Sequence, residues 1–195
     1  MRIPPRRVSL LLALGAAQLF ALSIAATSLA VRWDRDRLAV SAPQLHFLTG
    51  KALNRLHDGA SVAFDAQLSL LALAQPAPLQ RDVDRFVVSY DLWEEKFAVA
   101  RLGIPSSSAS HLSAEGVETW CIESMGLWPK GVDPGQTVRM RLELRAEDSR
   151  EQSLLPAESG ISLSGLIEIF SRPARTQQQK WLVESNPFRI RDFRK

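Results

Sequence analysis

The chain has 195 residues, of which 46% are hydrophobic and 23% charged, so it can bury one sizeable core but not two full domains. Its formal charge of +3 comes from the N-terminus, because three of its 24 Lys and Arg residues are Arg2, Arg6 and Arg7, which leaves 21 basic against 21 acidic side chains. A balanced remainder gives no reason to expect a nucleic-acid groove. The single cysteine, Cys121, cannot form an internal disulfide, and its spacing from its apolar neighbours predicts an inert thiol in the core.

The N-terminus has the pattern of an export signal or a membrane anchor. Residues 8–31 follow the basic first residues and carry no charge. Such a segment is rare in a buried soluble helix and is typical of chain export. Because the arginines keep the N-terminus in the cytoplasm, we expect residues 32–195 outside the cytoplasmic membrane, in the periplasm or cell envelope.

Two fates of this leader stay open. The strongly apolar part, residues 8–22, has the length of a signal peptide, and small residues such as Ser28 and Ala30 offer a peptidase site. The whole apolar run is long enough to cross a hydrocarbon core of about 30 Å. The uninterrupted length favours an uncleaved single-pass anchor in the cytoplasmic membrane, with a cleaved, secreted form as the alternative.

The first part of the exported region predicts a strand, a helix and a second strand. Residues 38–48 alternate loosely, and Pro43 favours an edge position. Thr49 can cap a helix over residues 51–57, which Gly59 ends. From Ala60 the period becomes two, which predicts a half-buried strand with one polar face.

The middle of the chain predicts a strand, a bend, a loop and a helix. A strand is expected over residues 85–93, and the apolar phase shifts after Glu94 and Glu95, as in a bulge or tight bend. Residues 106–110 are polar and predict a loop. Ser113 then caps a helix that runs to Met125.

The clearest strand covers residues 138–147, where apolar and charged side chains alternate strictly. One face should belong to the core, with Leu142 and Leu144 buried, and the other should face water. The wet face carries Arg139, Arg141 and Arg145.

The C-terminal part predicts a third helix and the last strands. The helix covers residues 162–171, and the strands cover residues 181–183 and 188–190 with a break at Pro187. Together the elements predict one mainly β domain over residues 32–195, antiparallel and sandwich-like, with five or more strands and two or three short helices.

Three stretches of the exported region have a shared pattern of apolar and turn residues. They cover residues 56–64, residues 86–99 with Tyr90 to Trp93 at the centre, and residues 181–185. In this order, and behind such a leader, they resemble the bacterial exported family catalogued as domain of unknown function 4390. The resemblance covers most of the exported domain and implies a location and a fold. The family has no assigned activity that could be carried over.

No catalytic or metal site is expected from the residues. The candidate bases are His46, His57 and His111, and none of them lies in a catalytic motif. Metal-ligand spacings such as His-x-x-His or Cys-x-x-Cys are missing from the sequence. His57 or His111 within hydrogen-bond reach of a serine and a carboxylate in a pocket would overturn a non-enzymatic function in favour of an enzyme.

The residues favour a non-enzymatic binding module without a cofactor. Trp93 and Trp128 stand off the apolar phase or beside a proline, and they are the tryptophans most suited to a ligand surface. The arginines of the wet face, Arg139, Arg141 and Arg145, complete the candidate binding residues. Candidate partners are an envelope protein, a lipid or a wall component. The alternative is an envelope hydrolase whose residues converge only in the fold.

Overall fold

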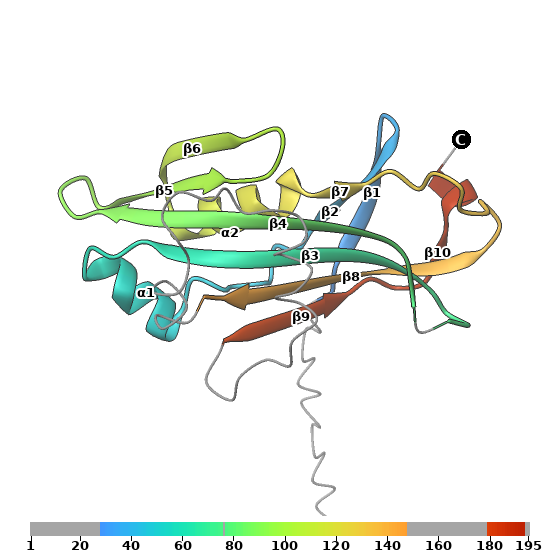
Figure 1. The fold of residues 1–195 in the computed structure, drawn as a ribbon, viewed down its shortest axis with the longest axis horizontal. Helices are drawn as coiled ribbons and strands as arrows, with labels where there is room; N and C mark the ends of the chain where they lie inside the picture. Colours follow the sequence, from blue (N-terminus) through green and yellow to red (C-terminus); the bar gives the residue numbers. More distant parts are fainter. Residues whose placement is uncertain (1–27, 76, 148–178, 194–195) are drawn as a thin grey trace, which may run out of the picture.

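The computed structural model describes residues 28–75, 77–147 and 179–193 (Figure 1). Within these residues the chain is mainly antiparallel β with two α-helices, in agreement with the expected class. Residues 8–27 of the expected leader and the expected helix over residues 162–171 lie outside the described residues. No helix in the described part of the chain is long and apolar enough to cross a bilayer.

The larger sheet is built around its long central strands. Its order is β10-β8-β3-β4-β5-β6, and β9 also pairs with β8. The strands are β3 (Val62–Ala72), β4 (Pro78–Asp91), β5 (Lys96–Arg101), β6 (Ser107–Leu112), β8 (Thr137–Ala146), β9 (Lys180–Glu184) and β10 (Phe188–Arg189). A short 3-10 helix, Ile190–Phe193, follows β10.

The smaller sheet has the order β1-β2-β7, with β1 (Ala30–Asp34), β2 (Arg37–Ser41) and β7 (Gly126–Leu127). The strand expected over residues 38–48 therefore ends early, at Ser41. Pro43 follows closely and has no N–H to give to a ladder, so the chain continues to the first helix as a loop.

Both helices form where the sequence predicts them. They are α1 (Gly50–His57) and α2 (Ala114–Ser124). The Ser113 hydroxyl accepts a hydrogen bond from the Gly116 N–H at 3.1 Å, which caps α2. Thr49 precedes α1 with extended backbone but makes no side-chain cap, and Gly59 has the expected positive φ of 83°.

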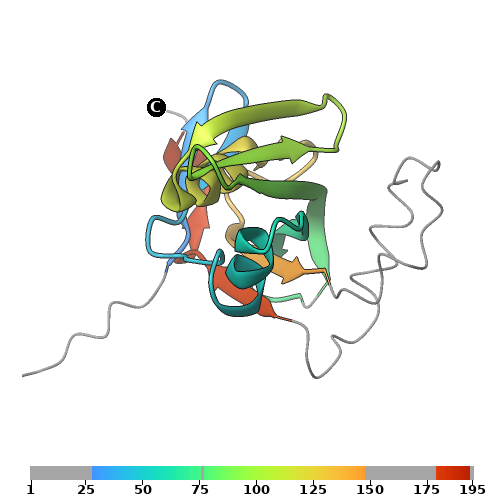
Figure 2. The same cartoon turned by 90° about the vertical axis from the view of Figure 1, so that its left-hand side faces the viewer.

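The larger sheet curves around the core, with α1, α2 and the smaller sheet on its inner side (Figure 2). The expected inner face of β8 is confirmed, because Leu142 and Leu144 are 0% and 1% exposed. Phe64 on β3 meets Phe47 from the loop before α1, edge to face, with ring centroids 5.0 Å apart. Cys121 on α2 is buried in the same core, and burial raises the pKa of its thiol far above the usual range.

The outer face of β3 differs from the expectation. The alternation predicted a polar, wet face, but Asp65 and Ser69 are only 1% and 3% exposed. β3 is a central strand with β4 and β8 on its two sides. Long side chains from both neighbours therefore lie beside its short polar ones, and Asp65 is bound by Arg85 at 2.6 Å. A charge can be buried here because it is paired.

The segment expected as a loop over residues 106–110 is mostly strand β6. Its serines are exposed because β6 pairs with β5 at the end of the sheet order. Burial therefore does not impose an apolar alternation on an edge strand, and the sequence pattern was too polar to indicate it. The bend expected at Glu94 and Glu95 is confirmed as the turn of the β4–β5 hairpin.

Candidate binding site

A surface depression of about 390 Å³ lies at the end of the sheet where β4 and β5 meet in their hairpin. It forms because three of its lining side chains are small, namely Ser89 on β4, Ala98 on β5 and Ser110 on β6. Ser89 and Ala98 are cross-strand partners, so they share one face of the sheet. Asp91 and Lys96 are the next pair on that face and rise beside them.

A β-bulge brings His111 to this depression. Phe97 pairs with Leu112 and Val99 with Ala109, so Ser110 and His111 both stand opposite Ala98. His111 has a φ of 59°, in the left-handed region that non-glycine residues rarely adopt. Such strain persists only where the surrounding structure enforces it, and it concentrates at functional positions.

His111 contacts a serine and a carboxylate. Its Nδ1 lies 3.0 Å from the Ser110 hydroxyl, and its Nε2 lies 3.1 Å from Glu94 Oε2. When Nε2 carries the proton and donates to Glu94, Nδ1 is free to accept the Ser110 O–H. By distance alone, this satisfies the condition set from the sequence for an enzyme.

Burial weighs against catalysis by these groups. The side chains of His111 and Glu94 are 69% and 55% exposed, and Ser110 is also exposed. In a catalytic serine site, the orienting carboxylate is buried and the oxyanion forms where water is excluded. An open serine and histidine instead offer hydrogen bonds to a ligand. Hydrogen-bond distances alone are therefore not evidence of catalysis at an exposed serine and histidine.

The rim of the depression has a fixed negative charge at Asp91. Asp91 Oδ1 accepts the backbone N–H groups of Glu94 at 3.1 Å and Trp93 at 2.8 Å. These two hydrogen bonds, the one from Glu94 first, lower the pKa of Asp91. The same hydrogen bonds shape the turn that carries Trp93.

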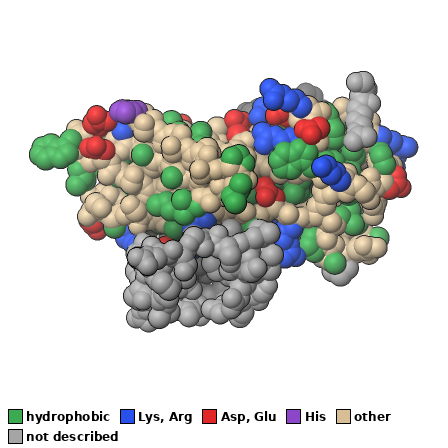
Figure 3. Space-filling view, turned by 45° about the horizontal axis from the view of Figure 1, so that its top comes forward, with side chains coloured by type: hydrophobic (Ala, Val, Ile, Leu, Met, Phe, Trp, Pro, Cys, Tyr) green, Lys and Arg blue, Asp and Glu red, His purple; other side chains and the backbone are tan. Residues whose placement is uncertain are grey.

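Trp93 lies at the tip of the hairpin and is 96% exposed, and its neighbour Leu92 is 57% exposed. The next residue, Glu94, lines the depression, whereas Trp93 itself does not. Figure 3 shows apolar atoms projecting at this end of the molecule, next to acidic side chains and a histidine. An exposed ring in the turn next to a polar depression is suited to contact a ligand.

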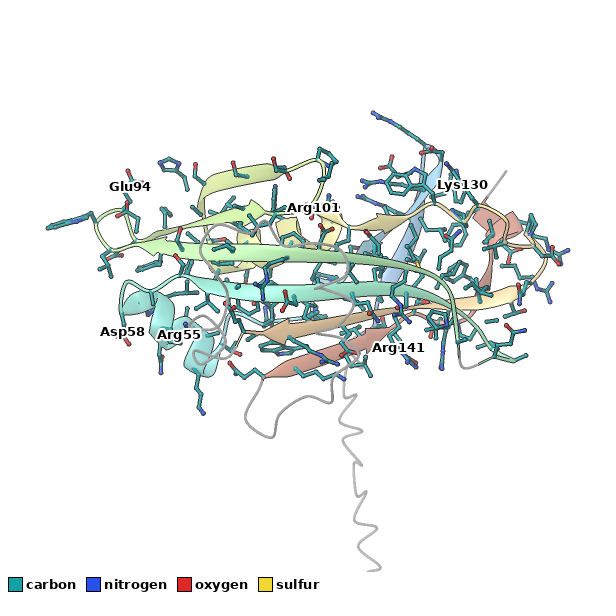
Figure 4. All side chains as sticks on the ribbon, in the orientation of Figure 1. Arg55, Asp58, Glu94, Arg101, Lys130 and Arg141 are labelled. Carbon is teal, nitrogen blue, oxygen red and sulfur yellow. The ribbon has the colours of Figure 1, made fainter. Side chains whose placement is uncertain are left out.

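Trp128, the second candidate tryptophan, is 46% exposed and follows β7. Its neighbour Lys130 lies far along the molecule from Glu94, the neighbour of Trp93 (Figure 4). The structure therefore does not bring the two tryptophans into one site.

The three candidate arginines are engaged in ion pairs along β8. Arg139 and Arg141 share Glu184 on β9, at 3.0 Å and 2.6 Å. Arg145 was expected in water but is 5% exposed, and its Nη2 lies 2.6 Å from Glu143. These pairs support the β8–β9 edge and take up much of the hydrogen-bonding capacity that a ligand would need.

The other two histidines have structural surroundings. The His57 ring lies 4.6 Å from the Tyr90 ring, centroid to centroid. His46 Nδ1 lies 2.8 Å from Oε2 of Glu118, whose Oε1 accepts the Phe47 and Leu48 N–H groups at 2.6 Å and 2.7 Å. Glu118 thereby fastens the loop before α1 to α2.

From the sequence, Trp93 was predicted as a binding residue, whereas Glu94, Lys96 and Ser110 were assigned no part in a site, and His111 was considered only as a base. The local signal was weak, because β6 was expected to be a loop. No group of three or more potential metal ligands occurs among residues 28–75, 77–147 and 179–193. Comparison of the chain with family models, curated proteins and solved structures finds no match.

Proposed function

We propose that this chain is a non-enzymatic binding module of the cell envelope and that it binds its partner at the depression beside Trp93. The observation that carries the proposal is the depression itself. Small side chains open it, polar groups of Asp91, Glu94, Lys96 and His111 surround it, and the hairpin turn next to it carries Trp93, which is 96% exposed. A concave surface with a few oriented polar groups and an aromatic edge is the usual form of a recognition site.

The envelope location rests on the uncharged leader over residues 8–31. An alkaline-phosphatase fusion after Arg37 should be active, and a cytoplasmic reporter at the same point should be silent. Mass spectrometry of the membrane-bound protein should detect the intact peptide containing Arg2, Arg6 and Arg7, because the anchor stays uncleaved. The reverse reporter pattern would refute export, and loss of that peptide would refute the anchor.

We also propose that the chain belongs to the family catalogued as domain of unknown function 4390 and that its architecture is sandwich-like. The supporting observations are the order of the three resembling stretches and the two sheets that share one core.

Site-specific photo-crosslinking of the full chain tests the binding surface. A photoreactive phenylalanine analogue in place of Trp93 should form an adduct in intact cells. The same analogue at Leu182, which is 52% exposed on β9, is the matched control and should not. Adding Glu94→Gln and His111→Ala should remove the adduct at position 93. Equal adducts at both positions, or none at position 93, would contradict the proposed site.

A hydrolase is the second candidate, because His111 does contact Ser110 and Glu94. In such a reaction, Ser110 Oγ would attack an ester carbonyl while Nδ1 of His111 takes its proton and passes it to the leaving alcohol. Water would then release the acid and restore the serine. Hydrolysis of p-nitrophenyl acetate by the full chain should not change on Ser110→Ala. A loss of about 100-fold or more would favour the enzyme over the binding module.

A further inference from the structure

Among the described residues, strand β6 lies at an open edge of the larger sheet. It pairs with β5 on one side, and no other strand of the described residues lies on its second side. Alternate residues of an edge strand direct their N–H and C=O groups away from the sheet, where another chain can pair with them. In folded proteins such edges are usually blocked by lysine, proline or a bulge. Residues 107–109 of β6 contain neither lysine nor proline, and the bulge comes after them, at Ser110 and His111.

The side chains of this edge leave it accessible. They are Ser107, Ser108, Ala109 and Ser110, all small, and the three serines are exposed. Three residues of regular strand extend over about 10 Å, which is enough for a short extended peptide to begin a ladder of main-chain hydrogen bonds. The edge ends at the depression, because Ser110 and His111 belong to both.

The depression selects the charge of a side chain that enters it. Asp91 and Glu94 line it together with Lys96, and Glu95 adds a further carboxylate in the same turn. Hydrogen bonds from the Glu94 and Trp93 N–H groups lower the pKa of Asp91, so this carboxylate stays ionised. The exposed indole of Trp93 can also receive a cation on its face. The hairpin end is therefore complementary to a positively charged side chain.

We propose that β6 accepts an extended segment of a partner protein as an added strand and that an arginine or lysine side chain of this segment enters the depression. Main-chain hydrogen bonds to residues 107–109 supply affinity, and the carboxylates of Asp91 and Glu94 supply selectivity for the cation. The proposal rests on the binding function proposed above and narrows its partner to a protein with a basic, extended segment.

Synthetic peptides test the two parts of the proposal separately. The probe is the blocked heptapeptide Thr-Val-Thr-Arg-Thr-Val-Thr, added to the ¹⁵N-labelled full chain in lipid nanodiscs. It should shift the backbone amide signals of residues 107–110 and the side-chain signal of Trp93. The peptide with Glu in place of Arg should bind about fivefold more weakly or worse, because it loses one exposed ion pair and meets like charges. A peptide N-methylated at alternate residues should give no shift at the same concentration, because it cannot complete the ladder.

Variants of the chain identify the carboxylate. Glu94→Gln should reduce the preference for the Arg peptide over the Glu peptide to about twofold or less. Asp58→Asn is the matched control, since Asp58 lies at the end of α1 and does not line the depression, and it should leave the preference unchanged. Because the peptides are varied as well as the chain, the test does not depend on a variant that fails to fold.

Several outcomes would overturn strand addition. Equal binding of the N-methylated peptide would show a site without main-chain pairing. A peptide partner would be refuted if none of the peptides shifts the backbone amide signals of β6. It would also be refuted if the adduct at position 93 contains a saccharide or a lipid. In these cases the binding function stands as long as the position-93 adduct forms. If neither the adduct nor the peptide shifts appear, both proposals fall.

Discussion

The guanidinium of Arg85 holds the carboxylate of Asp65 in a two-point contact on the outer face of the larger sheet. Arg85 Nε lies 2.6 Å from Asp65 Oδ1 and Arg85 Nη2 lies 3.1 Å from Asp65 Oδ2. The two residues are 5% and 1% exposed. They are also cross-strand partners, so the sheet register itself sets this geometry.

Asp65→Ala should lower the free energy of unfolding by about 3 kcal/mol, because it removes the bidentate partner of a buried cation but leaves Arg85 its second carboxylate, Glu147, at 3.5 Å. Urea denaturation followed by tryptophan fluorescence measures this change. Asp34→Ala is the control. Asp34 pairs with Arg37 at 3.5 Å on a partly exposed hairpin, and its loss should cost about 1 kcal/mol or less. Similar costs for the two variants would show that the buried pair contributes no more than a surface pair.

The two faces of β8 should respond differently to truncation. Leu142 is 0% exposed, so Leu142→Ala should cost about 2 to 5 kcal/mol through lost transfer free energy and the cavity left behind. Arg141 is about one-third exposed and paired with Glu184, so Arg141→Ala should cost roughly 1 kcal/mol or less. Thermal and urea unfolding of both variants provide the comparison. Equal destabilisation would mean that the two faces contribute equally to the core.

The contact between His46 and Glu118 should make stability depend on pH. The hydrogen bond to Glu118, then its charge, and more weakly the charge of Glu115, raise the pKa of His46 above its usual 6.5. A pKa that is higher in the folded state stabilises the fold fully below the unfolded value, and this contribution is lost as the pH rises through the folded value. His46→Ala should therefore destabilise the chain more at pH 5.5 than at pH 9.

Urea denaturation of the wild type and of His46→Ala at the two pH values measures this difference. His57→Ala is a suitable control, since its ring lies against Tyr90 and contacts no carboxylate of the described residues in an ion pair. An equal effect of His46→Ala at both pH values would argue against a charge-dependent contact with Glu118.

Cys121 should be chemically inert in the folded chain. Its side chain is buried, and burial, followed by the charge of Glu118, raises the pKa of the thiol. The reactive thiolate is therefore scarce and shielded. Iodoacetamide at pH 8 should leave the native protein unmodified, as judged by intact mass, and should alkylate it fully in urea. Rapid alkylation without denaturant would show that α2 does not bury this face.

The local elements could be predicted where a short stretch of sequence contains its own reason for the structure. Ser113 caps α2 within three residues of itself, and the strict alternation over residues 138–147 separates the two faces of β8. The hairpin turn at Glu94 and Glu95 follows from a phase shift between neighbouring apolar residues. Each of these features depends on residues close in the chain, so the pattern alone was sufficient.

The candidate site could be predicted only in part. Trp93 stood out because it interrupts the apolar phase, and it is indeed exposed at the hairpin tip. The depression beside it requires β6 to pair with β5 and a bulge to bring Ser110 and His111 opposite Ala98. An exposed edge strand has no buried face and hence no period-two signal, so the sequence indicated a loop instead.

By itself, the sequence determined the mainly antiparallel β class, the two helices and the inner face of β8, because apolar periodicity follows directly from burial on one side. Only the tertiary structure decided which polar groups meet. Asp65 and Arg85 are 20 residues apart, and Glu118 and Phe47 are 71 residues apart. The local sequence pattern of a polar residue is the same whether its side chain faces water or pairs with a distant residue. Which of the two occurs depends on strand register and packing, and the local pattern does not contain them.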